Sequence, residues 1–135
     1  MFRTADAFNI STLYLVGYTA TPPKIQIDKV SLGAETWIPW EKREDLPALV
    51  QELKEQGYAI IALEKNSDSE DMSNLKLKMR NVQKVALIVG NEVDGIEEDI
   101  LSSCDHVVHI PMLGKKESLN VSIAAGIAMY ALRCQ

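Results

Sequence analysis

Three features that commonly mark a protein class are missing from this 135-residue sequence: long apolar runs, cysteine clusters and an excess of positive charge. Because no apolar run approaches the ~20 residues of a membrane-spanning helix, the sequence predicts no membrane partner. The N-terminus lacks the basic, apolar and small-residue regions of a signal peptide, and we therefore expect a cytoplasmic protein.

The scarcity of cysteine argues against a metal centre or a disulfide framework. Only Cys104 and Cys134 are present, and they form no metal-ligand pattern. Without an export signal, we expect both to be free thiols. His106 and His109 belong to one expected strand whose context differs from that of a metal site, so we interpret them as structural.

The shortage of positive charge also limits the kinds of partner. Lysine and arginine together number 14 against 19 acidic residues, which gives a net charge of −5. This balance argues against a broad electrostatic surface for nucleic acid. It leaves room for a local basic site at Lys115 and Lys116, which Arg3 could join, although such a lysine pair is more often a solvated loop.

What the sequence does contain is an alternation of strand and helix patterns. The length suits one domain, and 47% of the residues are hydrophobic. Residues 25–35 fit a helix or a strand, and 65–74 read as a polar loop. The alternation predicts an α/β fold with a parallel sheet flanked by helices. Its expected elements are a short helix that includes Phe2 and Phe8 and ends at Asn9, strands 13–17, 35–41, 58–64, 84–90 and 105–111, a helix from Asp45 to Gly57, a short acidic helix within 91–104, and a closing helix.

Two patterns make the centre of this fold specific. Leu46, Leu49, Val50 and Leu53 keep the spacing of one buried helix face. Residues 58–64 are apolar on both faces of a strand, which is the mark of a central strand in a parallel sheet, and 84–90 form a second strand that is apolar on both faces.

The closing stretch from Ile110 to Arg133 is the strongest candidate for a ligand site. Pro111 and Gly114 interrupt the strand pattern, so we expect residues 110–120 to fold back as a loop. Ser118 stands where a helix N-cap belongs, and the start of such a helix offers free backbone N–H groups to a ligand. In isolation, however, the segment 118–120 is more often a plain cap and first turn.

The same helix has two faces that can pack. One face carries small side chains and the other carries apolar ones: Ala124, Ala128 and Ala131 on the first, Ile123, Ile127 and Tyr130 on the second. We expect one face to pack on the protein's own sheet and the other on a second copy of the chain.

Three strands end in polar loops, at 62–65, 89–95 and 110–120, and the last two loops contain glycine. Ligands of open parallel sheets bind at the carboxyl ends of the strands, so we expect these loops to converge on one site. Each loop also has an ordinary interpretation, as a strand end, a solvated acid or a helix cap. No phosphate-binding or dinucleotide-binding glycine motif is present.

Four segments, FRTADAFNI, KVSLGAETWIPW, LIVGNEVDGI and IPMLGKKESLNVSIAAGIAMYAL, stand in this order along the chain. Together they resemble the catalytic domain of SpoU-type (TrmH-like) RNA ribose 2′-O-methyltransferases of the SPOUT class. The resemblance covers nearly the whole chain. It implies S-adenosylmethionine-dependent methyl transfer to a ribose 2′-hydroxyl of tRNA or rRNA, a homodimer and a C-terminal deep trefoil knot.

The resemblance also implies roles for individual residues. Those expected to bind the cofactor, largely through backbone groups, are Leu63, Glu64, Gly90, Asn91, Ile110, Met112, Gly114, Ser118 and Leu119. Those expected around the reacting ribose are Arg3, Glu92, Ser118 and Asn120. Arg3 matches an arginine that activates the hydroxyl, and its role as base or as orienting group stays open.

One departure from the family concerns the beginning of the chain. The family has a strand and an asparagine-glycine segment before the FRTADAF helix, whereas this sequence starts at Met1. We therefore expect a single methyltransferase domain over 1–135 without that strand and without an N-terminal RNA-binding extension. Two alternatives follow: a non-catalytic dimeric cofactor-binding module that has lost its RNA site, and an α/β domain that binds neither RNA nor cofactor.

Overall fold

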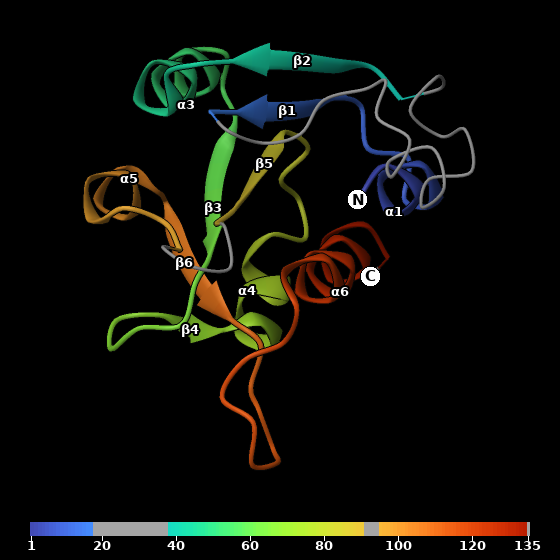
Figure 1. The fold of residues 1–135 in the computed structure, drawn as a ribbon, viewed down its shortest axis with the longest axis vertical. Helices are drawn as coiled ribbons and strands as arrows, with labels where there is room; N and C mark the ends of the chain where they lie inside the picture. Colours follow the sequence, from blue (N-terminus) through green and yellow to red (C-terminus); the bar gives the residue numbers. More distant parts are fainter. Residues whose placement is uncertain (18–37, 91–94, 135) are drawn as a thin grey trace. The chain divides into compact units, whose positions relative to one another are not determined.

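The computed structural model describes residues 1–17, 38–90 and 95–134 (Figure 1). They fall into two compact units, Met1–Leu49 and Val50–Gln135, and each unit has its own cluster of buried apolar side chains. Helix α3 (Leu46–Glu55) runs across the boundary between the units. In the described ranges, no helix is long and apolar enough to cross a bilayer.

The first unit contains helix α1 (Phe2–Ala7) and the parallel pair of strands β1 (Leu13–Val16) and β2 (Trp40–Arg43). Phe2 and Ala5 lie on one face of α1 and are buried together with Leu15 of β1. The expected helix and the expected strand at 13–17 are confirmed. The helix ends one residue before the predicted cap, since Phe8 is the C-cap and Asn9 follows it in the left-handed conformation at φ 53°.

The strand expected at 35–41 is wrong in its bounds. In the described residues the strand begins at Trp40 and runs to Arg43 through a polar, exposed sequence. Pro39 has no N–H to donate and enters the pairing only through its carbonyl, which accepts a 2.9 Å hydrogen bond from the Leu13 N–H. The undecided segment 25–35 lies outside the described residues.

The second unit is built on a four-stranded parallel sheet in the order β4-β6-β3-β5 (Figure 1). The strands are β3 (Ala59–Leu63), β4 (Glu70–Asp71), β5 (Val85–Val89) and β6 (His106–His109). β3 lies between β5 and β6, and Ile60, Ile61 and Ala62 are fully buried. The α/β class with a parallel sheet is therefore confirmed, as is the central position of the strand at 58–64.

The second strand with an apolar pattern occupies a different position. β5 pairs only with β3 in the described sheet, and all five of its residues are half-buried. An apolar sequence on both faces indicates what covers the faces of a strand. It carries no information about whether both edges of the strand are paired.

Helices α4 (Met72–Lys78) and α6 (Val121–Arg133) pack against one face of the sheet. The shared core contains Ile61, Leu75, Val108 and Ala128. The predicted loop at 65–74 is wrong in its second half, because β4 and the start of α4 lie there. The Asp71 carboxylate caps α4 by accepting a 2.8 Å hydrogen bond from the Ser73 N–H.

The remaining helices follow the sequence pattern. In α3, Leu49, Val50 and Leu53 are buried as predicted, and Asp45 caps the helix through a 3.1 Å hydrogen bond from the Ala48 N–H. The short acidic helix expected within 91–104 is α5 (Glu98–Ser103), which buries Ile100 and Leu101.

Candidate functional site

A pocket of about 560 Å³ lies in the second unit where β3, β5 and β6 end. Described residues from each of the three polar loops predicted to converge line this pocket. Its lining residues come from the end of β3, the end of β5, the connection from β6 to α6 and the first turn of α6: Leu63, Glu64, Lys65, Val89, Gly90, Gly95, His109, Ile110, Met112, Glu117, Ser118, Leu119, Asn120, Val121 and Ala124.

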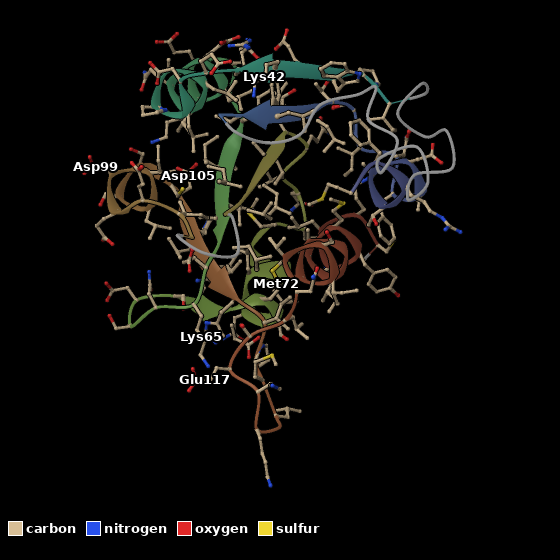
Figure 2. The ribbon with its side chains drawn as sticks, viewed as in Figure 1. Lys42, Lys65, Met72, Asp99, Asp105 and Glu117 are labelled. Atoms are coloured by element: carbon tan, nitrogen blue, oxygen red, sulfur yellow. The ribbon has the colours of Figure 1, made fainter. Side chains whose placement is uncertain are left out.

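The segment 110–120 forms one wall of the pocket. It contains no helix or strand, and Figure 1 shows it extending beyond the end of β6 before the chain returns into α6. The predicted fold-back loop is therefore confirmed. Lys65 and Glu117, both labelled in Figure 2, bring charges of opposite sign to this end of the sheet.

The start of α6 differs from the prediction. Asn120, rather than Ser118, is the N-cap, and its Oδ1 accepts a 2.9 Å hydrogen bond from the Ser122 N–H. Serine and asparagine are similarly good caps, so composition alone does not choose between them. Ser118 instead lies two residues earlier, in the exposed loop that lines the pocket, where its side chain is available to a ligand.

Glu64 has a role that the apolar pattern of its strand did not indicate. Its backbone N–H extends the pairing of β3 with β6 by donating to the Val108 carbonyl at 2.9 Å. Its half-buried carboxylate accepts a 2.9 Å hydrogen bond from the Ile96 N–H, 32 residues further along the chain. The side chain thus connects the end of β3 to the segment that precedes α5.

Two glycines meet beside this hydrogen bond. A β-carbon added to Gly90 would lie 2.5 Å from the carbonyl carbon of Gly95, closer than packed atoms allow. Gly95 has φ +68°, a conformation that glycine adopts at little cost. The close approach of the two backbones therefore requires glycine at position 90.

His109 is half-buried in the pocket wall, and its Nδ1 lies 2.8 Å from the Ser69 hydroxyl. His106 lies 3.1 Å from a Glu70 carboxylate oxygen, through its Nδ1. Both contacts fit the structural role predicted for the two histidines. In the part of the chain that the structure describes, no group of side chains is suited to hold a metal ion.

The two cysteines are free, as predicted. Burial raises the pKa of the Cys104 thiol, whose sulfur contacts the Ile100 carbonyl in α5. Cys134 is exposed after the last turn of α6.

Most of the predicted cofactor residues lie around this pocket. Those brought together are Leu63, Glu64, Gly90, Ile110, Met112, Ser118, Leu119 and, from the expected ribose site, Asn120. Gly114 is exposed and is not among the residues that line this pocket. Asn91 and Glu92 lie outside the described residues. Arg3 is exposed on α1, in the first unit.

Sequence patterns missed several residues of the wall: Lys65, Val89, Gly95, His109, Glu117, Val121 and Ala124. Lys65, Val89, Gly95 and Glu117 lie inside the predicted loops without having been singled out, whereas His109, Val121 and Ala124 lie beyond the loops' predicted ends. Gly95 carried a further signal, because an Asp-Gly pair marks a turn.

Comparison with known sequences gives consistent results along the chain. Residues 1–130 match the SpoU rRNA Methylase family. The chain is 33% identical over 134 residues to a tRNA (guanosine(18)-2′-O)-methyltransferase of Aquifex aeolicus, which covers 98% of this chain and 61% of the relative. It is 32% identical over 133 residues to a 23S rRNA (guanosine-2′-O-)-methyltransferase of Neisseria meningitidis, which covers 98% of this chain and 51% of the relative.

Comparison with solved structures shows the same fold. The crystal structure of an AdoMet-bound rRNA methyltransferase from Sinorhizobium meliloti superimposes with a TM-score of 0.83 at 26% identity. The match covers 98% of this chain and 49% of that one. The chain spans between 50% and 61% of the length of the first curated relatives that it matches.

Proposed function

The chain belongs to the SpoU rRNA methylase family, and we propose that it transfers the methyl group of S-adenosylmethionine to a ribose 2′-hydroxyl of tRNA or rRNA. The observation that supports this most directly is the pocket at the strand ends, which gathers eight of the twelve residues predicted for the site. Relatives named for transfer to tRNA and to rRNA both match almost the whole chain, so either RNA fits the proposal.

The pocket fits S-adenosylmethionine in size and chemistry. Its volume of about 560 Å³ lies within the usual range for small-molecule sites, about 300–1,000 Å³. Leu63, Val89 and Ile110 supply apolar walls for a flat ring. The irregular backbone of 110–120 supplies N–H and C=O groups that can hydrogen-bond the edge of an adenine. When bound, this cofactor supplies a methyl group on a positively charged sulfonium.

We assign the cofactor site to the residues predicted for it. Gly90, Ile110 and Leu119 hold the adenosine through shape and backbone groups, and Met112 closes the wall beside them. Gly114 and Asn91 belong to the same two loops and complete the assignment. Ser118 contributes through its side chain, because Asn120 takes the capping role at α6.

The acceptor hydroxyl needs help from the protein, because it is a poor nucleophile at neutral pH. Placing it in line with the methyl group can supply much of the acceleration. Arg3, Glu92, Ser118 and Asn120 are the residues that we assign to this task. Arginine keeps its proton in water, so Arg3 either orients the hydroxyl or removes its proton with the help of a substrate phosphate.

Radiolabelled methyl transfer to bulk tRNA and rRNA tests the function. We expect label at ribose 2′-oxygens with the wild-type protein, and a loss of about 100-fold or more with Arg3→Ala. Arg80→Ala removes another exposed arginine elsewhere on the chain and should leave the rate unchanged. A folded protein that binds S-adenosylmethionine but methylates neither RNA would contradict the proposal.

We also propose a homodimer and a C-terminal trefoil knot, both implied by membership in the family. Ile123, Ile127 and Tyr130 support the dimer, because this side of α6 is between 42% and 57% exposed. Large apolar side chains grouped on one exposed helix face are suited to an interface. A crystal structure that traces residues 105–135 through the surrounding chain would check the knot.

A further inference from the structure

Glu64 is unusual in the pocket wall because its carboxylate is hydrogen-bonded to the protein's own backbone. The Ile96 N–H donates to its Oε2 at 2.9 Å. Glu64 itself is held by the sheet, since its N–H donates to the Val108 carbonyl.

The carboxylate also packs closely against Gly95. A β-carbon added to Gly95 would lie 2.8 Å from Oε2 and 3.2 Å from Oε1 of Glu64. Gly95 in turn lies against Gly90, the first residue after β5. A continuous set of contacts therefore runs from the end of β3, through Gly95 and Ile96, to the end of β5.

From this geometry we propose that Glu64 is a positioning residue: its carboxylate holds Gly95 against Gly90 and so preforms the pocket wall that receives the cofactor. The proposal rests on the proposed function for the identity of the ligand. It differs from the role implied by the family resemblance, in which Glu64 binds the cofactor directly.

The competing explanation is direct attraction between the Glu64 carboxylate and the positive sulfonium of S-adenosylmethionine. The two explanations make opposite demands on the side chain. Positioning needs an oxygen acceptor at the correct reach, whereas attraction needs a negative charge near the ligand. Glutamine keeps the reach and loses the charge, and aspartate keeps the charge and loses the reach.

Calorimetric titration of Glu64→Gln and Glu64→Asp separates these explanations. We expect the Kd for S-adenosylmethionine to stay within about threefold of wild type for glutamine and to rise about tenfold or more for aspartate. The reverse order would overturn the proposal. Glu97→Gln is the matched control, because Glu97 is an exposed acid beside Ile96 whose side chain makes no capping hydrogen bond.

Titration with a second ligand separates the effect of charge from the effect of positioning. S-adenosylhomocysteine has the same adenosine but carries no sulfonium charge. Under the proposal, each Glu64 variant changes the Kd of both ligands by the same factor. If Glu64→Gln weakened the binding of S-adenosylmethionine but left that of S-adenosylhomocysteine unchanged, the carboxylate would act by its charge, and the proposal would be wrong.

Hydrogen exchange at the Ile96 amide provides a readout that needs no ligand. We expect slow exchange in wild type and Glu64→Gln, and exchange at least about tenfold faster in Glu64→Asp. Equal protection in all three proteins would overturn the role of Glu64 even if cofactor binding were intact. If wild type bound neither ligand, the proposed function would fail, and the exchange rates would still decide the role of Glu64.

Discussion

Single residues determine where the segments that line the pocket begin and end, and Asn120 is the clearest example. Its side chain ends the loop that lines the pocket and begins α6. Sequence reasoning placed the cap at Ser118, because serine and asparagine satisfy the same N–H groups equally well. The choice depends on where the backbone turns, and local composition does not contain that information.

Leu119 allows a test of the pocket at the scale of one side chain. It lines the pocket and is 37% exposed, so its side chain is only partly enclosed. Leu119→Ala should raise the Kd for S-adenosylmethionine modestly, by about tenfold or less, because apolar contact is lost while the backbone stays in place. Leu119→Trp should block binding by filling the space. Full-strength binding by the tryptophan variant in calorimetry would place the ligand elsewhere.

Asn120 should affect both stability and catalysis. Asn120→Ala removes the cap of α6 and should lower the free energy of unfolding by about 1 kcal/mol. Urea denaturation measures this, and Asn120→Asp should retain most of the stability because it keeps the acceptor. Methyl transfer should fall more than cofactor affinity in the alanine variant. A loss of affinity equal to the loss of transfer would remove Asn120 from the acceptor site.

At the scale of helices and strands, the elements with strong periodicity were predictable. Leu49, Val50 and Leu53 revealed α3, and the continuous apolar run at 59–63 revealed the central strand. Helix α4 was missed because its buried residues, Met72 and Leu75, are separated by polar ones and follow a polar stretch. A short helix of this kind is stabilised by the sheet on which it packs, and its own sequence carries a weak signal.

The β4–α4 segment carries a pH-dependent contribution to stability. The Glu70 carboxylate accepts a 2.9 Å hydrogen bond from Lys78, and this bond holds the pKa of Glu70 below its ordinary range against the opposing effect of desolvation. A lowered carboxyl pKa stabilises the fold above the ordinary value of about 4.3, and the contribution is lost as the pH falls through the lowered pKa.

We therefore expect Glu70→Gln to be less stable than wild type at neutral pH, with the difference shrinking below about pH 4. Thermal unfolding at a series of pH values measures the difference. Glu98→Gln, at an exposed acid on α5, is the control and should show a smaller effect. A difference between wild type and Glu70→Gln that stayed constant down to pH 2 would contradict this account of the ion pair.

Glycines at two element ends should respond differently to the same substitution. Gly57 follows α3 at φ +89° with open space around it, so Gly57→Ala should cost about 1 kcal/mol from backbone strain alone. Gly90→Ala should cost more, about 3 kcal/mol, because its β-carbon meets the Gly95 backbone. Gly90→Ala should also weaken the binding of S-adenosylmethionine. Equal costs in urea denaturation would show that the backbones at 90 and 95 separate easily.

At the scale of the whole molecule, family membership is established along the chain, whereas assembly is a proposal. The resemblance carried by four sequence segments was confirmed by the match over residues 1–130. The exposed apolar face of α6 was predicted as one of two packing faces. On the predicted small-residue face Ala128 is buried and Ala124 and Ala131 are half-buried, and the neighbouring Ala125 and Met129 are buried as well. Composition revealed the two faces, but it did not predict which one would be covered.

The dimer can be tested by placing a charge on the exposed face. We expect the wild-type protein to be a dimer at micromolar concentration, and Ile127→Glu to shift it towards monomer, because a carboxylate at the centre of an apolar interface stays desolvated and unpaired. Leu77→Glu makes the same change at an exposed leucine on α4 and should leave the dimer intact. Light scattering that found the wild type monomeric would refute the prediction.

The position of β3 in the sheet has a consequence for how the protein is made. β3 pairs with β6, and the Ile60 N–H donates to Asp105, 45 residues later. A growing chain therefore emerges from the ribosome with this apolar strand, whose centre is fully buried in the folded protein, unpaired on one edge until β6 has been synthesised. Non-local parallel pairing of this kind forms slowly, and an exposed strand edge favours aggregation. Chaperone demand and inclusion-body formation should consequently be greatest for chains that stop between β3 and β6.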